Sequence, residues 1–316
     1  MRVLVTGATG FVGGWMVERL LAEPGWLPMG VSRQGVWPPG LAHLGSVAMG
    51  AVDWSDRAGV AGLIHDFQPQ GLIHLAGYAS AGQSFRDPQS AWVGNLGVTR
   101  MLYQALEDSG VRPRVLHVGT GLVYAPPDGD YQILDEDAPL GPASPYAASK
   151  LAAECHARME CARLGLEVIV ARPFNHIGPR QDPQFALASF ARQIARMEKG
   201  LQPAFMETGN LSPARDLSDV RDIVEAYCLL LKSGASGQVY NLGSGQAVKI
   251  GDALTALLDL SRVPVTVTTR ADLLRPGEPE VFRANTTRLR RDTGWIPQYP
   301  LDQTLADLLE WCRIME

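Results

Sequence analysis

The sequence predicts an α/β fold, in which a doubly wound parallel sheet is joined to a smaller C-terminal α/β subdomain. Short apolar segments alternate with amphipathic helical patterns through the first half of the chain, as expected for parallel strands covered by helices on both faces. A glycine-rich turn at residues 6–13, TGATGFVG, lies directly between the first strand and its helix. After about residue 173 the elements become shorter and richer in Arg, Pro and Gly, which indicates a second, less regular layer.

Periodicity places the individual elements. Apolar runs predict strands, which cover residues 2–6, 27–33, 46–53, 71–77, 114–119, 166–173 and 238–245. Helical spacing predicts the helices between them, which cover residues 11–23, 56–68, 87–109 and 144–165. On the helix near 87–109, an apolar stripe is expected from Trp92, Leu96, Tyr103 and Leu106.

Composition narrows the classes of protein to consider. The 316 residues are 46% hydrophobic and 19% charged, which excludes a disordered chain. The formal net charge of -5 provides no basic footprint, so we expect no nucleic-acid partner. No apolar run reaches the roughly 18 residues of a membrane span, and no leader segment is evident, so we expect a cytoplasmic protein without a membrane partner. The four cysteines lack metal-binding spacing, so we expect reduced thiols and no metal site.

The glycine-rich turn has the features of a dinucleotide-binding loop. Gly7 permits the tight turn, Gly10 lets the backbone approach a pyrophosphate, and Gly13 allows close packing of helix on strand. The N-terminus of the following helix then offers free N–H groups to the phosphates. The spacing is GxxGxxG, and a tight turn without a ligand is the alternative interpretation.

The end of the second strand indicates which dinucleotide binds. Ser32 and Arg33 stand where an acidic residue would accept the adenosine ribose hydroxyls. We therefore expect Arg33 to pair with a 2′-phosphate, so that NADP(H) is preferred and NAD(H) is a weaker alternative; a solvated surface arginine is the competing interpretation. Asp53 and Trp54 follow the third strand and are expected to flank the adenine, although Asp53 could instead cap the next helix.

The segment YAASK, residues 146–150, places Tyr146 and Lys150 on one helix face. Ser144 and Pro145 are suited to the N-cap and first turn of that helix. An ammonium beside a phenol favours phenolate, so Lys150 is expected to lower the pKa of Tyr146 from its usual value of about 10. A tyrosine tuned in this way can exchange a proton with an alcohol or carbonyl oxygen.

The order of TGATGFVG, HLAG, VGTGLVY, YAASK, RPFN and YNLGSG resembles the extended short-chain dehydrogenase/reductases that modify nucleotide sugars, over essentially the whole chain. The resemblance implies a catalytic triad of Thr120, Tyr146 and Lys150. Tyr146 would be the general acid/base, Thr120 would hydrogen-bond the reacting oxygen, and Lys150 would hold the nicotinamide ribose. It implies further cofactor contacts from the residues of the same motifs, which are Phe11, Val12, Leu75, Ala76, Gly77, Pro173 and His176. His176 could instead be a hydrogen-bonded packing residue.

The resemblance also implies the division of the chain. Residues 1–173 would form an NADP-binding Rossmann domain. Residues 174–316 would mainly form the substrate-binding subdomain, with 220–261 returning to the Rossmann domain. The helices at 87–109 and 144–165 resemble those that pair in family dimers, so a homodimer is expected; their apolar faces could instead only cover the sheet.

The strand end at Thr120 distinguishes between reactions of this superfamily. Its dehydratases resemble T-D-E-V-Y or T-S-E-L-Y here, and the glutamate removes a sugar proton. This chain has Gly121 and Leu122 instead, and neither transfers a proton. Dehydration is therefore not expected.

The second half resembles the GDP-4-keto-6-deoxy-D-mannose reductases, which make GDP-D-rhamnose, through RPFNHIGPRQ, SFARQIARME and RDLSDVRD. Loop arginines are suited to gripping a diphosphate bidentately. The expected substrate contacts are Ser80, Thr120, Asn175, Arg180, Arg192, Arg215, Arg275 and Glu278. Arg192 could instead be a solvated helix residue. Tyr78, Arg180 and Asn285 depart from the pattern of the reductases.

Three functions remain open at this stage. The first is NADPH-dependent reduction of the C4 keto group of a GDP-4-keto-6-deoxyhexose. The second is a nucleotide-sugar 4-epimerase with retained NAD, which Arg33 does not favour. The third is a non-catalytic NADP-binding protein, which the triad does not favour.

Overall fold

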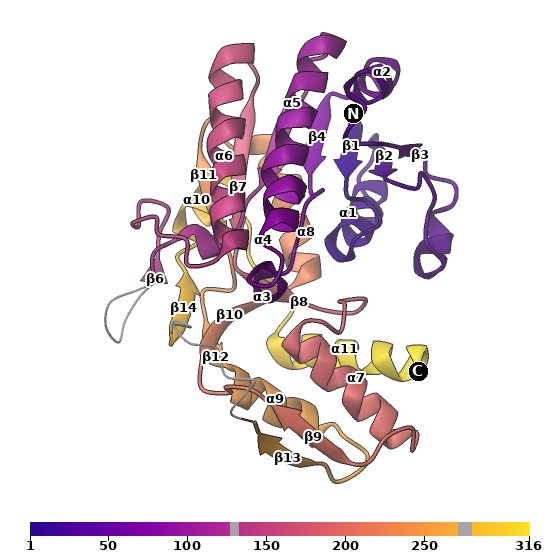
Figure 1. Ribbon diagram of the computed structural model, residues 1–316, viewed down its shortest axis with the longest axis vertical. Helices are drawn as coiled ribbons and strands as arrows, with labels where there is room; N and C mark the ends of the chain where they lie inside the picture. The colour runs from indigo at the N-terminus through magenta and orange to yellow at the C-terminus, as the bar shows by residue number, and fades with distance from the viewer. Residues whose placement is uncertain (127–132, 271–279) are drawn as a thin grey trace.

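The computed structural model describes residues 1–126, 133–270 and 280–316. Its largest feature is a seven-stranded sheet in which every pairing is parallel. The strands are β1 (Arg2–Thr6), β2 (Leu27–Ser32), β3 (Met49–Ala51), β4 (Gly71–His74), β5 (Arg114–Val118), β7 (Val168–Pro173) and β11 (Val239–Leu242). Their order across the sheet is β11-β7-β5-β4-β1-β2-β3, so the prediction of a doubly wound parallel sheet is confirmed (Figure 1).

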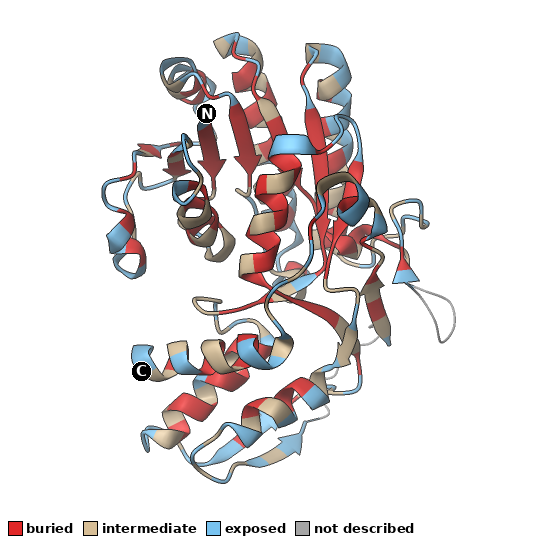
Figure 2. Ribbon diagram, turned by 180° about the vertical axis from the view of Figure 1, so that it is seen from behind, coloured by how far each residue is buried: buried red, intermediate tan, exposed pale blue. Residues whose placement is uncertain are grey.

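Helices cover both faces of this sheet (Figure 1). One face carries α2 (Arg57–Phe67), α5 (Val98–Ser109) and α6 (Pro145–Leu164), and the other carries α1 (Phe11–Leu21), α8 (Val220–Ser233) and α10 (Thr287–Thr293). Burial on β1 follows from this arrangement, because Val3 and Val5 pack into the α1 and α8 side while Leu4 packs into the α2 and α5 side. Both sides of each central strand are therefore buried, as the red strands of Figure 2 show.

The helix expected near 87–109 is continuous but irregular. It consists of α4 (Pro88–Trp92), a π-helical turn η2 (Val93–Gly97) and α5. Tyr103 and Leu106 are fully buried, whereas Trp92 is 38% exposed, so the single stripe predicted from helical spacing is wrong. The reason is the π turn, whose wider spacing rotates the residues before it onto another face of the helix.

A second layer lies below the large sheet in Figure 1. Its sheet runs β12 (Ala247–Lys249), β10 (Ala214–Asp219), β14 (Val281–Ala284) and β6 (Ile133–Leu134), with β8 (Asn175–Ile177) also paired to β10. A two-stranded parallel sheet, β9 (Phe205–Thr208) and β13 (Thr266–Thr269), packs with α7 (Ala186–Glu198), α9 (Ile250–Asp259) and α11 (Leu301–Met315) around a separate apolar core.

The chain returns to the large sheet for a shorter stretch than predicted. α8 and β11 join the Rossmann layer, but α9 packs with α7 and α11 in the second core. The predicted return through residue 261 is therefore wrong after β11. Its cause is the apolar face of α9, where Ala253, Leu254 and Leu257 are buried against the second layer.

The sheet order places the candidate residues. The strand order reverses between β1 and β4, and ligands of open α/β sheets bind outside the carboxyl ends of the strands at such a point. The remaining short elements are η1 (Pro39–Leu44), α3 (Ala81–Ser84) and η3 (Gly121–Val123). α3 and η3 follow β4 and β5 at that edge. Within the described residues, no helix has the length and apolar character needed to cross a membrane.

Candidate active site

The loop at the N-terminus of α1 needs glycines because the backbone packs closely there. Gly7 has a φ of 69°, and a Cβ there would lie 2.8 Å from the backbone nitrogen of Ala76. A Cβ at Gly13 would lie 2.2 Å from the carbonyl oxygen of Gly7, which no side chain tolerates. Gly10 is the N-cap of α1 and provides no side-chain hydrogen bond to its first turn. The loop therefore fits the pyrophosphate of a dinucleotide, with backbone N–H groups as donors.

A buried hydrogen-bond network beneath this loop was not anticipated. The Thr6 hydroxyl oxygen accepts hydrogen bonds from the backbone N–H groups of Leu75 (3.1 Å) and Ala76 (3.0 Å). The same hydroxyl donates a hydrogen bond to Nδ1 of His74 at 2.8 Å, and Nε2–H of His74 donates to the Thr99 hydroxyl at 3.1 Å. Burial, with the nearby Lys150 charge, lowers the pKa of His74 to about 3, so this imidazole stays neutral. The network fixes the Leu75–Ala76 backbone beside Gly7.

Cofactor candidates from the start of α1 and from β8 pack against each other. The rings of Phe11 and His176 are stacked, with centroids 6.1 Å apart and planes 9° apart. Nδ1–H of His176 donates to the carbonyl oxygen of Phe174 at 3.0 Å, and burial lowers the pKa of His176. Val12 is half-buried beside Phe11, and Pro173 is buried at the end of β7. These side chains form an apolar wall at the sheet edge.

At the end of β2, the Ser32 hydroxyl accepts a hydrogen bond from the Gly35 N–H, and Arg33 is exposed. Asp53 accepts hydrogen bonds from the N–H and hydroxyl of Ser55, which lower its pKa. The helix α2 is capped by Asp56, so the alternative of Asp53 as its cap is wrong.

Trp54, next to Asp53, is half-buried. Its ring lies edge-on to His74 with centroids 6.4 Å apart, and it packs against the core under α2 and α5. Gly77 is exposed at the end of the β4 turn, where a Cβ would lie 2.6 Å from the side-chain oxygen of Asn95.

The three residues of the expected triad meet at the start of α6. Ser144 caps this helix by accepting the Ala147 N–H, and Pro145 occupies its first turn, as the sequence predicts. Thr120 follows β5 as the N-cap of η3, and its side chain hydrogen-bonds Tyr146. Lys150, one turn further along α6, donates from Nζ to the carbonyl oxygen of Val118 at 2.6 Å.

The electrostatics of this group differ from the prediction. Burial raises the pKa of Tyr146, and the hydrogen bond with Thr120 opposes that rise. Burial lowers the pKa of Lys150 to about 8, and the Glu154 carboxylate opposes that fall. The expected lowering of the Tyr146 pKa by Lys150 is therefore wrong for this structure, because the ammonium is directed at Val118 and both groups are desolvated.

Neutral side chains that the sequence analysis missed hold Tyr146 in place. The Ser84 hydroxyl accepts the Tyr146 N–H at 3.2 Å, and the Ser149 hydroxyl donates to the Tyr146 carbonyl at 2.8 Å. Asn95, in the π turn, donates to Ser149 at 2.9 Å and accepts the Tyr78 N–H at 2.9 Å. Asn95 thus connects the turn after β4 to α6. Asn95 is polar within the otherwise apolar segment Val93–Gly97, and this was the sequence signal that could have identified it.

The turn after Thr120 has no room for an acidic side chain at its first position. A Cβ at Gly121 would lie 2.7 Å from the ring of Phe174. Leu122 packs against the apolar cluster of Tyr124, Phe174 and Phe282. Gly121 and Leu122 therefore provide no group for proton transfer.

Some of the predicted substrate residues lie near this edge. Ser80 caps α3 by accepting the Gln83 N–H, and Asn175 is exposed at the start of β8. Arg215 lies in β10 and donates to the carbonyl oxygen of Ala214 at 3.0 Å. The positions of Arg275 and Glu278 lie outside the described residues.

Two predicted substrate arginines already have carboxylate partners. Arg180 donates from both terminal nitrogens to Glu18 on α1, at 2.6 and 2.7 Å, and its guanidinium lies 3.7 Å from the Trp15 ring centroid. Arg192, on α7, pairs with Glu316. The geometry gives both guanidinium groups a structural partner, so it does not support their assignment to the substrate diphosphate. Arg180 also has a φ of 76°, in the left-handed backbone region that favours glycine.

Comparison with known proteins places the chain among its relatives. Residues 3–243 match the NAD dependent epimerase/dehydratase family. The chain belongs to this family, and it is an extended short-chain dehydrogenase/reductase.

Two curated relatives of this family member are similar along their whole length. GDP-6-deoxy-D-mannose reductase from Pseudomonas aeruginosa is 36% identical and covers 98% of this chain and 97% of its own length. UDP-glucose 4-epimerase from Mycolicibacterium smegmatis is 32% identical and covers 99% of both chains. Among solved structures, that of RMD from Pseudomonas aeruginosa complexed with NADPH is 34% identical, covers 99% of both chains and superposes with a TM-score of 0.87. The chain is therefore an enzyme of the nucleotide-sugar oxidoreductase and epimerase group.

Proposed function

We propose that the protein is an NADPH-dependent nucleotide-sugar 4-ketoreductase, which reduces the C4 keto group of GDP-4-keto-6-deoxy-D-mannose to GDP-6-deoxy-D-mannose, also called GDP-D-rhamnose. The observation that carries this proposal is the turn after Thr120. Thr120 and Tyr146 are hydrogen-bonded there, and the Phe174 ring excludes any side chain at Gly121. Leu122, in the position of the dehydratase glutamate, packs against an apolar cluster. Such a site can deliver one proton to an oxygen, but it lacks the acid that a dehydratase uses on a neighbouring carbon.

The mechanism assigns one task to each residue of the triad. The bound nicotinamide supplies a hydride to carbon C4. Tyr146 donates its proton to oxygen O4, and its raised pKa means that the phenol is protonated at neutral pH, ready to act as the acid. Thr120 hydrogen-bonds the same oxygen and stabilises the negative charge that develops on it. Lys150, one turn further along α6, would hold the nicotinamide ribose.

The cofactor choice follows from the end of β2. Arg33 is exposed there and no acidic side chain occupies that strand end, so a guanidinium is available for a 2′-phosphate. The similar RMD structure holds NADPH, which supports the same preference here. NAD(H) remains a weaker substrate of the same site, because the remaining contacts to the dinucleotide come from the glycine loop and the Phe11–His176 wall.

The sugar nucleotide is assigned from the relatives and from the second layer. The name of the Pseudomonas aeruginosa relative specifies GDP-6-deoxy-D-mannose, and the similarity to it extends through the whole second half of this chain. Ser80 and Asn175 would contact the sugar, and Arg215 would contact the diphosphate. Arg275 and Glu278 keep the same assignment as predictions from the sequence.

A 4-epimerase with retained NAD is the second candidate, because one curated relative is UDP-glucose 4-epimerase at 32% identity. A single experiment separates the two functions. Purified protein is mixed with NADPH and GDP-4-keto-6-deoxy-D-mannose, and the nicotinamide absorbance is followed. Loss of one NADPH per keto sugar is expected. No loss of NADPH, together with interconversion of UDP-glucose and UDP-galactose, would replace the reductase proposal by the epimerase.

We also propose that the protein is a homodimer formed through the helices on the α5 and α6 side of the sheet. Trp92 and Val93, next to α5, and Met159 on α6 are apolar side chains exposed by 38%, 57% and 55%. α5 and α6 lie side by side in Figure 1, and apolar side chains exposed on neighbouring helices are typical of a subunit interface. Sedimentation at micromolar concentration is expected to show a dimer, and a monomer only would contradict this proposal.

A further inference from the structure

The helix α6 carries a third polar side chain in line with the catalytic pair. Tyr146, Lys150 and Glu154 follow one another at intervals of four residues, which puts all three on one face. Glu154 is only 1% exposed. The mechanism above gives this carboxylate no task, although burying a charge without a partner is costly.

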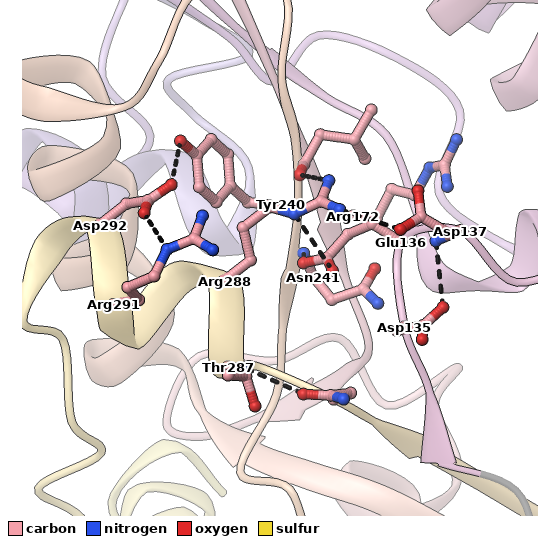
Figure 3. A network of polar contacts seen from close by, with 12 residues as sticks. Asp135, Glu136, Asp137, Arg172, Tyr240, Asn241, Thr287, Arg288, Arg291 and Asp292 are labelled. Atoms are coloured by element: carbon pink, nitrogen blue, oxygen red, sulfur yellow. Dashed lines mark hydrogen bonds and ion pairs between the residues drawn. The ribbon is translucent and has the colours of Figure 1, made fainter.

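The partner of Glu154 is an arginine of the neighbouring strand. On β7, Arg172 donates from Nε to Glu154 at 2.9 Å and from Nη2 at 2.6 Å, a bidentate pair that is itself 2% exposed at the arginine. The remaining nitrogen of the guanidinium, Nη1, donates to the Tyr124 hydroxyl at 2.9 Å, and that hydroxyl donates to the Asn241 side-chain oxygen at 2.7 Å. The outer end of this network is closed by Glu136, which accepts the Asn241 N–H at 2.8 Å (Figure 3). Glu154 is therefore held rigidly.

The carboxylate lies across the strand that supplies the Lys150 acceptor. A Cβ at Gly119 would lie 3.4 Å from Oε2 of Glu154, so the pair passes over the backbone at this glycine. Gly119 is between Val118, which accepts the Lys150 hydrogen bond, and Thr120. The negative end of the Glu154–Arg172 pair is thus placed beside the site of the Lys150 ammonium.

We propose that Glu154, fixed by Arg172, is a positioning residue that keeps the Lys150 side chain charged for its contact with the nicotinamide ribose. This inference rests on the proposed role of Lys150 in the reductase. Without the carboxylate, a desolvated lysine would give up its proton near neutral pH and lose both its charge and one donor.

The other groups that face Lys150 do not supply this charge. His74 on β4 and His117 on β5 both interact with Lys150, and burial lowers the pKa of His74 to about 3 and that of His117 well below its usual range. Both imidazoles are therefore neutral at neutral pH. Tyr146 is protonated, because burial raises its pKa. Glu154 is the group that raises the pKa of Lys150, against the effect of burial.

The first test compares Glu154→Gln with Glu160→Gln. Glu160 is also buried on α6 and also paired with an arginine, Arg163 at 2.8 Å, which makes it a matched control. NADPH affinity is measured by tryptophan fluorescence across the alkaline range. We expect the pH at which affinity is lost to fall by about one unit in Glu154→Gln, so that binding above it is roughly tenfold weaker. Glu160→Gln should follow the wild-type curve.

Glu154→Gln leaves the Arg172 guanidinium buried without a carboxylate, so this variant could fail to fold. A second variant is therefore needed. The double variant E154M/R172M removes both charges, a change that buried pairs often tolerate. It should keep the wild-type circular dichroism and show the same downward shift of the NADPH affinity curve. Glu154→Asp, which retains the carboxylate, should move the curve back toward the wild type.

The two proposals fail in different ways. If the double variant is folded and its NADPH affinity follows the wild-type curve at every pH, Glu154 does not control the Lys150 charge and the inference is wrong. If the wild type binds NADPH but does not consume it with the GDP-keto sugar, the proposed reduction is wrong, and the comparison of NADPH curves still decides the role of Glu154.

Discussion

The edge of the large sheet and the arginines around the second layer differ in how their side chains are used. At the sheet edge, close backbone packing requires the glycines of the loop, and the Thr120 and Tyr146 side chains are hydrogen-bonded to each other. Around the second layer, Arg180 and Arg192 are held by Glu18 and Glu316. A glycine turn is defined by its own backbone, whereas the partner of a long cationic side chain is chosen by whatever the fold brings near it.

This contrast suggests that substitutions at the sheet edge change the chemistry, while substitutions of the paired arginines change stability. The largest effect is expected for Tyr146→Phe, which removes only the proton donor. The rate of NADPH oxidation with the keto sugar should fall by about 10²–10⁴, and NADPH affinity should be nearly unchanged. Tyr103→Phe is the matched control, because the Tyr103 hydroxyl is buried without a hydrogen-bond partner. A Tyr146→Phe enzyme with more than a tenth of the wild-type rate would exclude Tyr146 as the acid.

Arg33→Asp tests the cofactor end of the same edge. An aspartate there would repel a 2′-phosphate and accept the ribose hydroxyls, so the ratio of kcat/KM for NADPH to that for NADH should fall by roughly tenfold to a hundredfold. Arg262→Asp, at an exposed arginine of the second layer, serves as the charge control. An unchanged ratio in Arg33→Asp would show that Arg33 is a solvated surface residue.

Lys150→Met tests whether the buried Lys150 charge destabilises the folded protein while it serves cofactor binding. The pKa of Lys150 is lowered to about 8 in the folded protein, against 10.5 for an ordinary lysine. Below about pH 8, the buried charge therefore lowers the free energy of unfolding. This destabilisation disappears as the pH rises from about 8 to about 10.5, because Lys150 is then neutral in the folded protein. Lys150→Met should raise the free energy of unfolding by about 1–3 kcal/mol at pH 7 and by much less above pH 10.

Urea unfolding at several pH values measures this effect, with Lys249→Met at an exposed strand residue as the control. A gain in stability that does not depend on pH would trace the effect to packing of the methionine rather than to the charge. Loss of NADPH affinity in the same variant would connect the costly charge to cofactor binding.

The smallest effects on catalysis are expected at the paired arginines. Arg180→Met leaves Glu18 half-buried beside Trp15, so it should lower the free energy of unfolding by about 1–2 kcal/mol and leave KM for the sugar nucleotide within about twofold. Arg192→Met breaks a half-exposed pair with Glu316, which keeps Arg196 as a second partner, so stability should change by less than about 0.5 kcal/mol. Arg215→Met should instead raise KM by about tenfold. A tenfold rise of KM in Arg180→Met or Arg192→Met would show that this arginine does contact the substrate.

The sequence was informative wherever a short segment defines its own geometry. The glycine loop, the capped start of α6 and the four-residue spacing of Tyr146 and Lys150 could all be read directly from residues 6–13 and 144–150. The apolar stripe on the preceding helix could not be predicted. A π turn at Val93–Gly97 shifts the faces of that helix, and no sequence pattern indicated the turn. Asn95 was missed for the same reason, although it links Tyr78 to the turn of α6 that carries Tyr146.

The sequence alone determined the family and the parallel sheet, and it indicated the residues of the proposed catalytic triad, because these depend on periodicity and on patterns within a few residues. Only the tertiary structure decided how the charges are paired. Glu154 meets Arg172 from a different strand, Arg180 meets Glu18 across the two layers, and Lys150 is directed at Val118 rather than at Tyr146. Electrostatic interactions depend on distance and burial in three dimensions, and neither can be obtained from separation along the chain.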